Sequence, residues 1–179
     1  PFQYNPVKGI LKVAEKITVK VNKVGPGKVN VNTPLRGKMS PSFDKVYQKR
    51  FINYGEVRKL YPEVDDGDKM IIITASSLKE PVAALAAWKN QKGIATTVYN
   101  YPDETGGSGA NSVKSFIQAQ FDEAQMTYII IVGDDGDVPS LSAGGGKSDP
   151  SFILLKGGDV YPDAFIGRLS ASSTGDIET

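Results

Sequence analysis

The sequence contains no cysteine and no histidine. Hydrolases that pair a serine or cysteine nucleophile with a histidine base need an imidazole to accept the proton of the nucleophile. The chain therefore cannot perform that chemistry with its own side chains. The same two absences exclude a structural zinc site built from cysteine and histidine ligands.

Long apolar runs and an excess of one charge are also missing. No apolar stretch approaches the roughly 18 residues of a membrane-spanning helix, so we expect no membrane span. The 21 basic and 20 acidic residues give a net charge of +1, and the two signs are interspersed along the chain. This pattern predicts no basic surface for nucleic acid, so we expect no nucleic-acid partner. Hydrophobic residues make up 40% and charged residues 23%, the balance of a soluble globular protein.

The texture of the sequence divides the chain into three segments. Within residues 1–24, Ile17, Val19 and Val21 alternate with polar residues, which predicts a half-buried β-strand. Residues 25–60 begin with a stretch rich in glycine, proline, asparagine and lysine, in which we expect Pro34 and Pro41 to block regular structure. We interpret this segment as a linker or processing region. Residues 61–179 form the third segment.

Strand and helix patterns alternate from Lys69 onward. Residues 70–74 (MIIIT) and 128–132 (YIIIV) are β-branched runs, typical of strands buried on both faces, and residues 94–101 predict a further strand. One helix is expected between Ser77 and Gly93, and a second, with a single apolar stripe, begins at Asn111. This order predicts an α/β fold with a parallel sheet and helices on both faces.

Several shorter features complete the expected fold. Residues 151–155 and 164–166 are interpreted as short strands, and residues 172–174 as the start of another helix. We place Trp88 in the core and assign Arg168 to an internal ion pair. Gly144, Gly145 and Gly146 are not followed by the Lys-Ser/Thr of a phosphate-binding loop and predict a turn instead.

Three acidic residues follow the strand at 128–132, namely Asp134, Asp135 and Asp137. The carboxyl ends of parallel strands are the usual ligand sites of open α/β sheets, and a phospho-receiver domain keeps acidic residues there with magnesium. The supporting lysine and hydroxyl residues of such a domain are not identifiable here. A calcium-loop spacing with a bidentate glutamate is also absent. We therefore expect Asp134 to cap or brace the loop.

Six stretches of the sequence, taken in order, carry a family resemblance. They are residues 1–6 (PFQYNP), 69–74 (KMIIIT), 88–93 (WKNQKG), 128–134 (YIIIVGD), 147–149 (KSD) and 158–169 (GDVYPDAFIGRL). Together they resemble the gingipain family of secreted cysteine peptidases. The resemblance implies a caspase-like α/β fold, with the end of a β-strand propeptide in residues 1–24 and the first subdomain of the peptidase in residues 61–179.

The resemblance also implies where the reactive residues lie. In the family the catalytic histidine and cysteine belong to the second subdomain, beyond Thr179, which agrees with their absence from this chain. The expected function is that of the N-terminal, scaffold part of a cysteine endopeptidase that is not catalytic alone. Its expected partners are a second subdomain or chain carrying the histidine and cysteine, and protein or peptide substrates. The expected location is secreted or at the cell surface.

A processing site is expected shortly before the first buried strand. The mature enzymes of the family begin near the place that corresponds to Arg58 and Lys59, and a basic pair beside a proline suits a cut by an Arg- or Lys-directed peptidase. The competing interpretation is a solvated surface pair. Other candidate cleavage positions are Arg36, Lys38, Lys45, Lys49 and Arg50.

A calcium site is expected in the loop that begins at Lys156. Asp159, Tyr161 and Asp163 occupy alternate positions, so their side chains can point the same way, and calcium prefers six to eight oxygen ligands. The resemblance adds backbone carbonyl ligands at Lys156 and Tyr161. In the alternative interpretation, Pro162 makes a turn and the two carboxylates face water.

Two other functions remain open from the sequence. One is a non-catalytic binding or secretion-associated module that shares the caspase-like fold, and the other is a flavodoxin-like domain that binds a small ligand. A Gly-His-Gly turn followed by a cysteine after Thr179 would favour the peptidase, and a tightly bound coloured cofactor would favour the flavodoxin-like domain. We also expect marginal stability without the second subdomain, because a sheet cut within a domain leaves an unpaired edge.

Overall fold

The computed structural model describes residues 2–20, 22, 24–26 and 38–177. They belong to two compact units, residues 1–33 and residues 34–179. In the first unit, β1 (Phe2–Asn5) and β2 (Ile10–Val13) form an antiparallel hairpin. The Asn5 side chain closes the turn, because its Oδ1 accepts hydrogen bonds from the backbone N–H groups of Val7 and Lys8, both at 3.1 Å.

The strand expected at Ile17, Val19 and Val21 is wrong for the first two residues, since residues 14–20 contain no strand, and Val21 lies outside the described residues. The alternation there is real, but a strand needs a neighbour to pair with, and the turn chemistry of residues 5–9 pairs the preceding segments instead. Cross-strand pairs Phe2–Val13 and Tyr4–Leu11 place four apolar side chains on one face of the hairpin, and all four are exposed.

The second unit begins with helices, where the sequence predicted a linker. Helix α1 (Pro41–Arg50) starts at the N-cap Ser40, whose hydroxyl accepts a hydrogen bond from the backbone N–H of Phe43. Pro41 is the first helical residue, a position that tolerates proline because its missing N–H would be unpaired anyway. The expectation that Pro41 blocks regular structure is therefore wrong, and Pro34 lies outside the described residues. Helix α2 (Tyr54–Val57) and the 3-10 helix η1 (Arg58–Leu60) follow.

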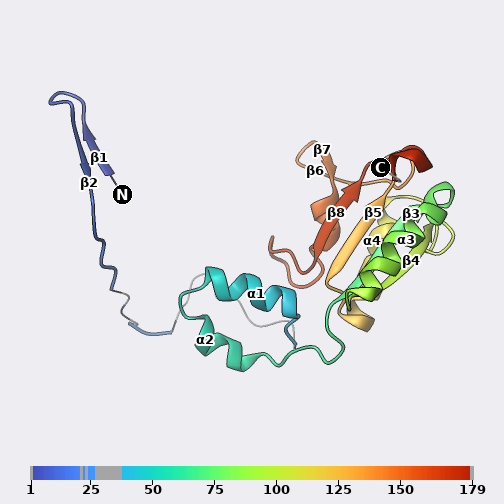
Figure 1. Cartoon of the computed structure of the whole chain (residues 1–179), viewed down its shortest axis with the longest axis horizontal. Coiled ribbons are helices and arrows are strands. Elements are labelled where there is room, and N and C mark those ends of the chain that lie inside the picture. The colour runs from blue at the N-terminus through green and yellow to red at the C-terminus, as the bar shows by residue number, and fades with distance from the viewer. Residues whose placement is uncertain (1, 21, 23, 27–37, 178–179) are drawn as a thin grey trace. The chain divides into compact units, whose positions relative to one another are not determined.

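A four-stranded parallel sheet forms the centre of this unit, in the order β4, β3, β5, β8 (Figure 1). Its strands are β3 (Lys69–Ala75), β4 (Ala95–Tyr101), β5 (Tyr128–Val132) and β8 (Phe165–Leu169). Strand β3 lies between β4 and β5, and helices cover its two faces, so six of its seven residues are buried. The predicted buried strand, typical of parallel sheets, is confirmed.

Helices cover both faces of the sheet, as predicted. After the 3-10 turn η2 (Ser76–Leu78), helix α3 (Lys79–Gln91) packs Val82 and Ala86 on the face that carries Ile72. Helix α4 (Ala110–Ala124) packs Val113 and Ile117 on the opposite face. Within the described residues, no helix combines the length and the apolar character needed to cross a bilayer.

Two local predictions are wrong. Residues 151–155 were expected to form a strand, but most of them belong to the 3-10 helix η3 (Asp149–Ile153), which begins with Pro150 in its first turn. Trp88 was expected in the core but is 48% exposed, and the ammonium groups of Lys89 and Lys92 lie 4.7 and 5.0 Å from its ring centroid. At about 100° per residue, Trp88 lies roughly 200° around the helix from buried Ala86, outside the buried stripe.

The remaining short elements follow β5 and β8. Strands β6 (Leu141–Ala143) and β7 (Gly146–Ser148) form an antiparallel hairpin whose turn residues Gly144 and Gly145 have φ of +59° and +84°, which confirms the predicted turn. The 3-10 helix η4 (Thr174–Asp176) begins at Ser173 with a capping box. The helix start predicted at residues 172–174 thus coincides with a capped helical turn.

Candidate functional site

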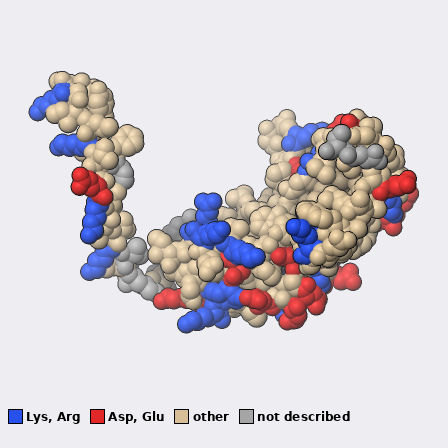
Figure 2. Space-filling view, in the orientation of Figure 1, with Lys and Arg blue, Asp and Glu red and all other residues tan. Residues whose placement is uncertain are grey.

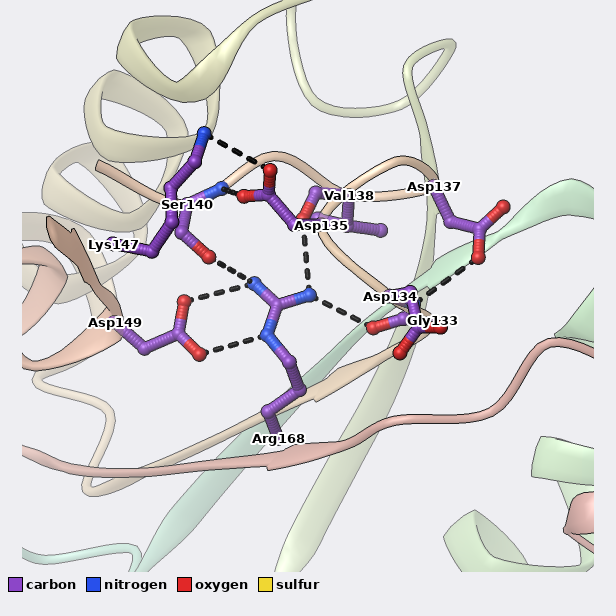
Figure 3. Close-up of polar contacts among 9 residues, drawn as sticks. All are labelled: Gly133, Asp134, Asp135, Asp137, Val138, Ser140, Lys147, Asp149 and Arg168. Atoms are coloured by element: carbon purple, nitrogen blue, oxygen red, sulfur yellow. Dashed lines mark hydrogen bonds and ion pairs between the residues drawn. The ribbon is translucent and has the colours of Figure 1, made fainter. Parts of the chain in front are cut away.

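The carboxyl end of the sheet is organised around Arg168, the fourth residue of β8 (Figure 3). Its guanidinium binds the Asp149 carboxylate in a bidentate manner, with Nε–Oδ2 at 2.7 Å and Nη2–Oδ1 at 2.8 Å. Nη1 donates to the backbone carbonyls of Gly133 at 2.8 Å and Val138 at 3.0 Å, and Nη2 also donates to Ser140 Oγ at 3.0 Å. All five N–H donors of this arginine are therefore used within the protein.

The Arg168–Asp149 pair is mostly withdrawn from water. The two side chains are 12% and 20% exposed. Hydrogen bonds from Arg168 lower the pKa of the Asp149 carboxyl, although partial burial works in the opposite direction. The predicted internal ion pair of Arg168 is confirmed, and a guanidinium with no spare donor is a scaffold element that cannot also bind a substrate carboxylate through direct hydrogen bonds.

The loop after β5 is braced by two of the three acidic residues that follow this strand. Asp135 accepts a hydrogen bond from the Ser140 backbone N–H at 2.8 Å and pairs with Lys147 at 2.9 Å, and these contacts lower its pKa. Asp137 Oδ2 accepts from the Asp134 backbone N–H at 3.1 Å. The brace expected from Asp134 is thus supplied by the side chains of its neighbours. The Asp134 backbone carbonyl closes the turn, because it accepts hydrogen bonds from the N–H groups of Asp137 and Val138.

Gly133 makes this loop possible. Its φ of +119° is a conformation that L side chains rarely adopt, and a Cβ at this position would lie 2.9 Å from the Cβ of Asp137. The chain therefore leaves β5 through a glycine, and the Gly133 carbonyl is turned toward Arg168.

The loop of the predicted calcium site is closed by one of its own carboxylates. Asp163 Oδ2 accepts hydrogen bonds from the backbone N–H groups of Leu155 and Lys156, both at 2.8 Å. Asp159 Oδ1 accepts from the Tyr161 N–H at 2.9 Å. Both carboxylates thus bind backbone amides of the loop, and the expected backbone ligands Lys156 and Tyr161 are the residues whose amides they hold.

Lys114 of helix α4 holds the segment just before this loop, a role that the sequence did not suggest. Its Nζ donates to the backbone carbonyls of Ser151, Phe152 and Leu154, at 3.3, 3.1 and 2.8 Å. Burial lowers the pKa of this ammonium, whereas the nearby charge of Asp163 raises it. The sequence could not predict this role. Lys114 looks like any lysine on the polar side of an amphipathic helix, and the carbonyls that it binds lie in and next to a 3-10 helix about 40 residues away.

No ready-made metal centre exists among residues 2–20, 22, 24–26 and 38–177. Nowhere in these ranges do three aspartate, glutamate, cysteine or histidine side chains come together as a group that could hold a metal ion. A cation at the 156–163 loop would therefore depend on Asp159, Asp163 and backbone carbonyls, which is a donor set of the oxygen type that calcium accepts.

The amino end of the sheet carries the predicted processing segment. Arg58 pairs with Asp44 of helix α1 through Nε and with Glu63 through Nη2, while its Nη1 donates to the Tyr61 carbonyl. Its side chain is 26% exposed. The adjacent Lys59 is exposed. Arg58 and Lys59 thus lie in the same 3-10 turn but in different surroundings.

Asp44 is the centre of this second network. It accepts hydrogen bonds from the Tyr54 hydroxyl as well as pairing with Arg58. Burial first, and then the hydrogen bond to Asp44, raise the pKa of Tyr54 to about 12. Among the rival cleavage positions, Lys38 pairs with Asp65, whereas Lys45, Lys49 and Arg50 are exposed, and Arg36 lies outside the described residues.

Figure 2 shows basic and acidic side chains interspersed on the face that it presents, in keeping with the near-zero net charge. The two networks consist of arginines, one lysine, carboxylates, the hydroxyl groups of Ser140 and Tyr54, and backbone groups. With no thiol and no imidazole anywhere in the sequence, they can position segments of the chain but cannot activate a nucleophile in the manner of a Cys–His hydrolase.

Comparisons with known proteins agree with this structure. Residues 64–179 match the model of peptidase family C25. The chain is 30% identical over 181 aligned residues to gingipain R2 of Porphyromonas gingivalis, an alignment that covers 100% of the chain and 25% of that protein. The chain therefore spans about a quarter of the length of this curated relative.

Two solved structures share the fold. The crystal structure of the Arg-specific cysteine proteinase gingipain R is 32% identical, with a TM-score of 0.61 over 65% of this chain and 28% of that one. A complex of the pro- and mature domains of RgpB from Porphyromonas gingivalis is 33% identical, with a TM-score of 0.59 over 62% of this chain and 27% of that one. The predicted caspase-like α/β fold is confirmed.

The family match covers well over half of the chain and includes the whole parallel sheet with both of its covering helices. The gingipain resemblance drawn from short stretches of sequence is thereby confirmed. The chain belongs to peptidase family C25.

Proposed function

We propose that the whole protein is a cysteine endopeptidase and that this chain is its scaffold part. The observation that carries the proposal is the match of residues 64–179 to a peptidase family, in a sequence that contains neither cysteine nor histidine. The thiolate nucleophile and its imidazole base then come from a region of the parent protein outside these 179 residues.

The role of this chain in such an enzyme is to fix the sheet and the loops at its carboxyl end. Arg168 joins β8 to the exit of β5 and to η3 through five hydrogen bonds. A rigid support of this kind holds a neighbouring reactive centre in its productive geometry. The substrates would be proteins or peptides, and the gingipain R relative, called Arg-specific, points to a basic residue before the scissile bond.

A peptidase assay tests the proposal. The purified 179-residue chain and the parent protein are incubated with fluorogenic peptides that carry arginine, lysine or alanine before the cleaved bond. We expect hydrolysis by the parent protein only, abolished by a thiol-alkylating reagent and lost when the parent's cysteine is replaced by alanine. Absence of thiol-dependent hydrolysis by the parent would favour the non-catalytic module, and hydrolysis by the chain alone would contradict the scaffold role.

We further propose that residues 1–24 are the end of a propeptide and that the protein is made as a secreted or surface-bound zymogen. The support is the RgpB structure, a complex of pro- and mature domains, and the alignment of the entire chain with gingipain R2. Processing after Arg58 or Lys59 would separate the propeptide from the enzyme. N-terminal sequencing of the protein recovered from the culture medium tests this, with a new terminus at Lys59 or Leu60 as the expected result.

Calcium is proposed as a structural ion of the 156–163 loop. Asp159 and Asp163 would supply carboxylate oxygens, and Lys156 and Tyr161 would supply backbone carbonyls. The ion would neutralise the two carboxylates and stabilise the loop. Calorimetric titration of the chain with calcium tests the site: we expect binding that is lost in Asp159→Asn and kept in the control Asp122→Asn, and unchanged binding in Asp159→Asn would place the ion elsewhere.

A further inference from the structure

Arg50 and Arg58 differ in how far their following peptide bonds are presented to a peptidase. Arg50 is the last residue of α1 and is exposed. The next residue, Phe51, has an extended backbone (φ −109°, ψ 125°) and is 54% exposed, and Ile52 is 99% exposed. A peptidase needs an accessible segment that can be drawn out into an extended conformation. The Arg50–Phe51 bond lies at the exposed end of α1, where the backbone hydrogen bond from the Phe51 N–H to the Tyr47 carbonyl, at 2.9 Å, must open before the segment can be drawn out.

In contrast, the side chain of Arg58 is bound to other groups of the folded protein. It belongs to the 3-10 helix η1, and its guanidinium binds Asp44, Glu63 and the Tyr61 carbonyl. An arginine must enter the pocket of an Arg-directed peptidase with its guanidinium free, so these contacts must open first. Proteolysis of a folded segment then follows the small population that is locally open.

We propose that an Arg-directed peptidase cuts the Arg50–Phe51 bond before the Arg58–Lys59 bond, and that the second cut follows the departure of helix α1. In the first step, water adds to the Arg50 carbonyl carbon and the C–N bond to Phe51 breaks, which leaves a carboxylate on Arg50 and an amine on Phe51. This order deepens the processing proposed above, but it rests on the accessibility of the two bonds and not on the activity of the parent protein.

The fragment that ends at Arg50 remains held after the first cut. Phe43 is 7% exposed, and its ring stacks on Phe165 with centroids 4.5 Å apart. Ser42 Oγ accepts a hydrogen bond from the Tyr128 hydroxyl at 2.6 Å and donates to Asp68 at 2.7 Å. Met39 exchanges backbone hydrogen bonds with the segment before β3. These contacts do not depend on the bond between Arg50 and Phe51.

Asp44 connects the two cuts. It lies on α1, upstream of Arg50, whereas Arg58 lies downstream. The first cut therefore turns a contact within one polypeptide into a contact between two fragments. When α1 dissociates, Arg58 loses the carboxylate of Asp44 and keeps Glu63 and the Tyr61 carbonyl as partners, so the segment around the second bond opens more readily.

Digestion of the 179-residue chain with an Arg-specific peptidase tests the order. The chain has four arginines, at positions 36, 50, 58 and 168, so mass spectrometry identifies each cut from its fragments. We expect the Arg50–Phe51 bond to be cut at least about tenfold faster than the Arg58–Lys59 bond, because local opening limits the latter. Fragments 1–50 and 51–179, with or without a cut at Arg36, should co-elute in gel filtration. A cut at Arg58 that is as fast or faster would overturn the proposal.

Matched variants separate the proposed order from general unfolding. Arg50→Gln should remove the first cut and delay the second, whereas Lys49→Gln should change neither. Asp44→Asn keeps every arginine and weakens the hold on Arg58, so we expect the Arg58 cut to quicken about fivefold, with the Arg50 cut unchanged. An equal acceleration of both cuts in Asp44→Asn would mean that whole-domain opening controls them, which contradicts the proposal.

Discussion

The two ends of the sheet each use an arginine to hold a neighbouring segment, but with different consequences. At the carboxyl end, Arg168 is 12% exposed, and all five of its N–H donors form hydrogen bonds within the protein. At the amino end, Arg58 is 26% exposed, and one of its partners, Glu63, is 62% exposed. Burial and the number of partners therefore distinguish a permanent structural contact from one that can open.

The aromatic contacts add to this difference. The amino end holds α1 through the Phe43 ring, which stacks on Phe165, and through polar contacts of Ser42 and Asp44. The carboxyl end holds its loops through hydrogen bonds to a charged group. Removing a polar group from a buried network leaves its partners unpaired, whereas removing an apolar ring leaves a cavity, so the two ends should respond to mutation by different amounts.

The largest effect is expected from Arg168→Met. This change leaves the Asp149 carboxylate and two backbone carbonyls without their donor in a mostly buried place, and breaking a buried pair in this way costs about 3–5 kcal/mol of unfolding free energy. Urea denaturation measures the loss. The double variant Arg168→Met/Asp149→Leu removes both charges and should recover part of it. Equal stability of Arg168→Met and the unmodified chain would contradict the structural role.

Phe43→Ala should have the next largest effect. The buried ring of Phe43 packs on Phe165, and Phe→Ala changes in cores cost about 3 kcal/mol or more. Because α1 is an outer element, we expect part of this cost to appear as separate unfolding of α1, visible as faster hydrogen exchange in residues 41–50. Phe43→Leu keeps most of the apolar surface and serves as the control. Unchanged exchange in Phe43→Ala would mean that α1 is held by other contacts.

Several features of the sheet and of its carboxyl end could be predicted from the sequence. The runs at β3 and β5 predicted buried parallel strands because β-branched residues without alternation suit a strand covered on both faces. The apolar stripe of α4 was equally clear, and Arg168 was expected to find an internal partner. These features depend on short-range pattern, which one sequence contains.

Other parts could not be read in this way. Phe43 and Asp44 lie in a segment that looked like a linker, and their roles depend on Phe165 and Arg58, which are distant in sequence. The apolar run at 151–155 suits a strand or a buried turn equally, and tertiary contacts decide in favour of the turn, since Lys114 binds three of its carbonyls. Arg58 and Lys59 look equivalent as a basic pair, and only the fold separates them.

The stability of the chain in acid should depend on the titration of Asp149, at the carboxyl end of the sheet. Contacts with Arg168 lower the pKa of Asp149 in the folded chain below its unfolded value of about 3.9. The resulting stabilisation is therefore complete above that pH and disappears as the pH falls through the folded pKa. We expect the unfolding free energy of the unmodified chain to fall more steeply below about pH 4 than that of Asp149→Asn. Parallel pH profiles would contradict this assignment.

Glu63→Gln should have the smallest effect on stability, which sharpens the contrast between the two arginines. Glu63 is 62% exposed, and solvent-exposed ion pairs contribute little because water screens them and the side chains lose freedom. We expect no measurable shift in thermal unfolding, together with a faster cut after Arg58 by an Arg-specific peptidase. The control Glu80→Gln, on α3, should change neither quantity. A loss of stability in Glu63→Gln comparable to that in Arg168→Met would mean that the Arg58 network is as structural as the Arg168 network, and the distinction between the two ends of the sheet would fail.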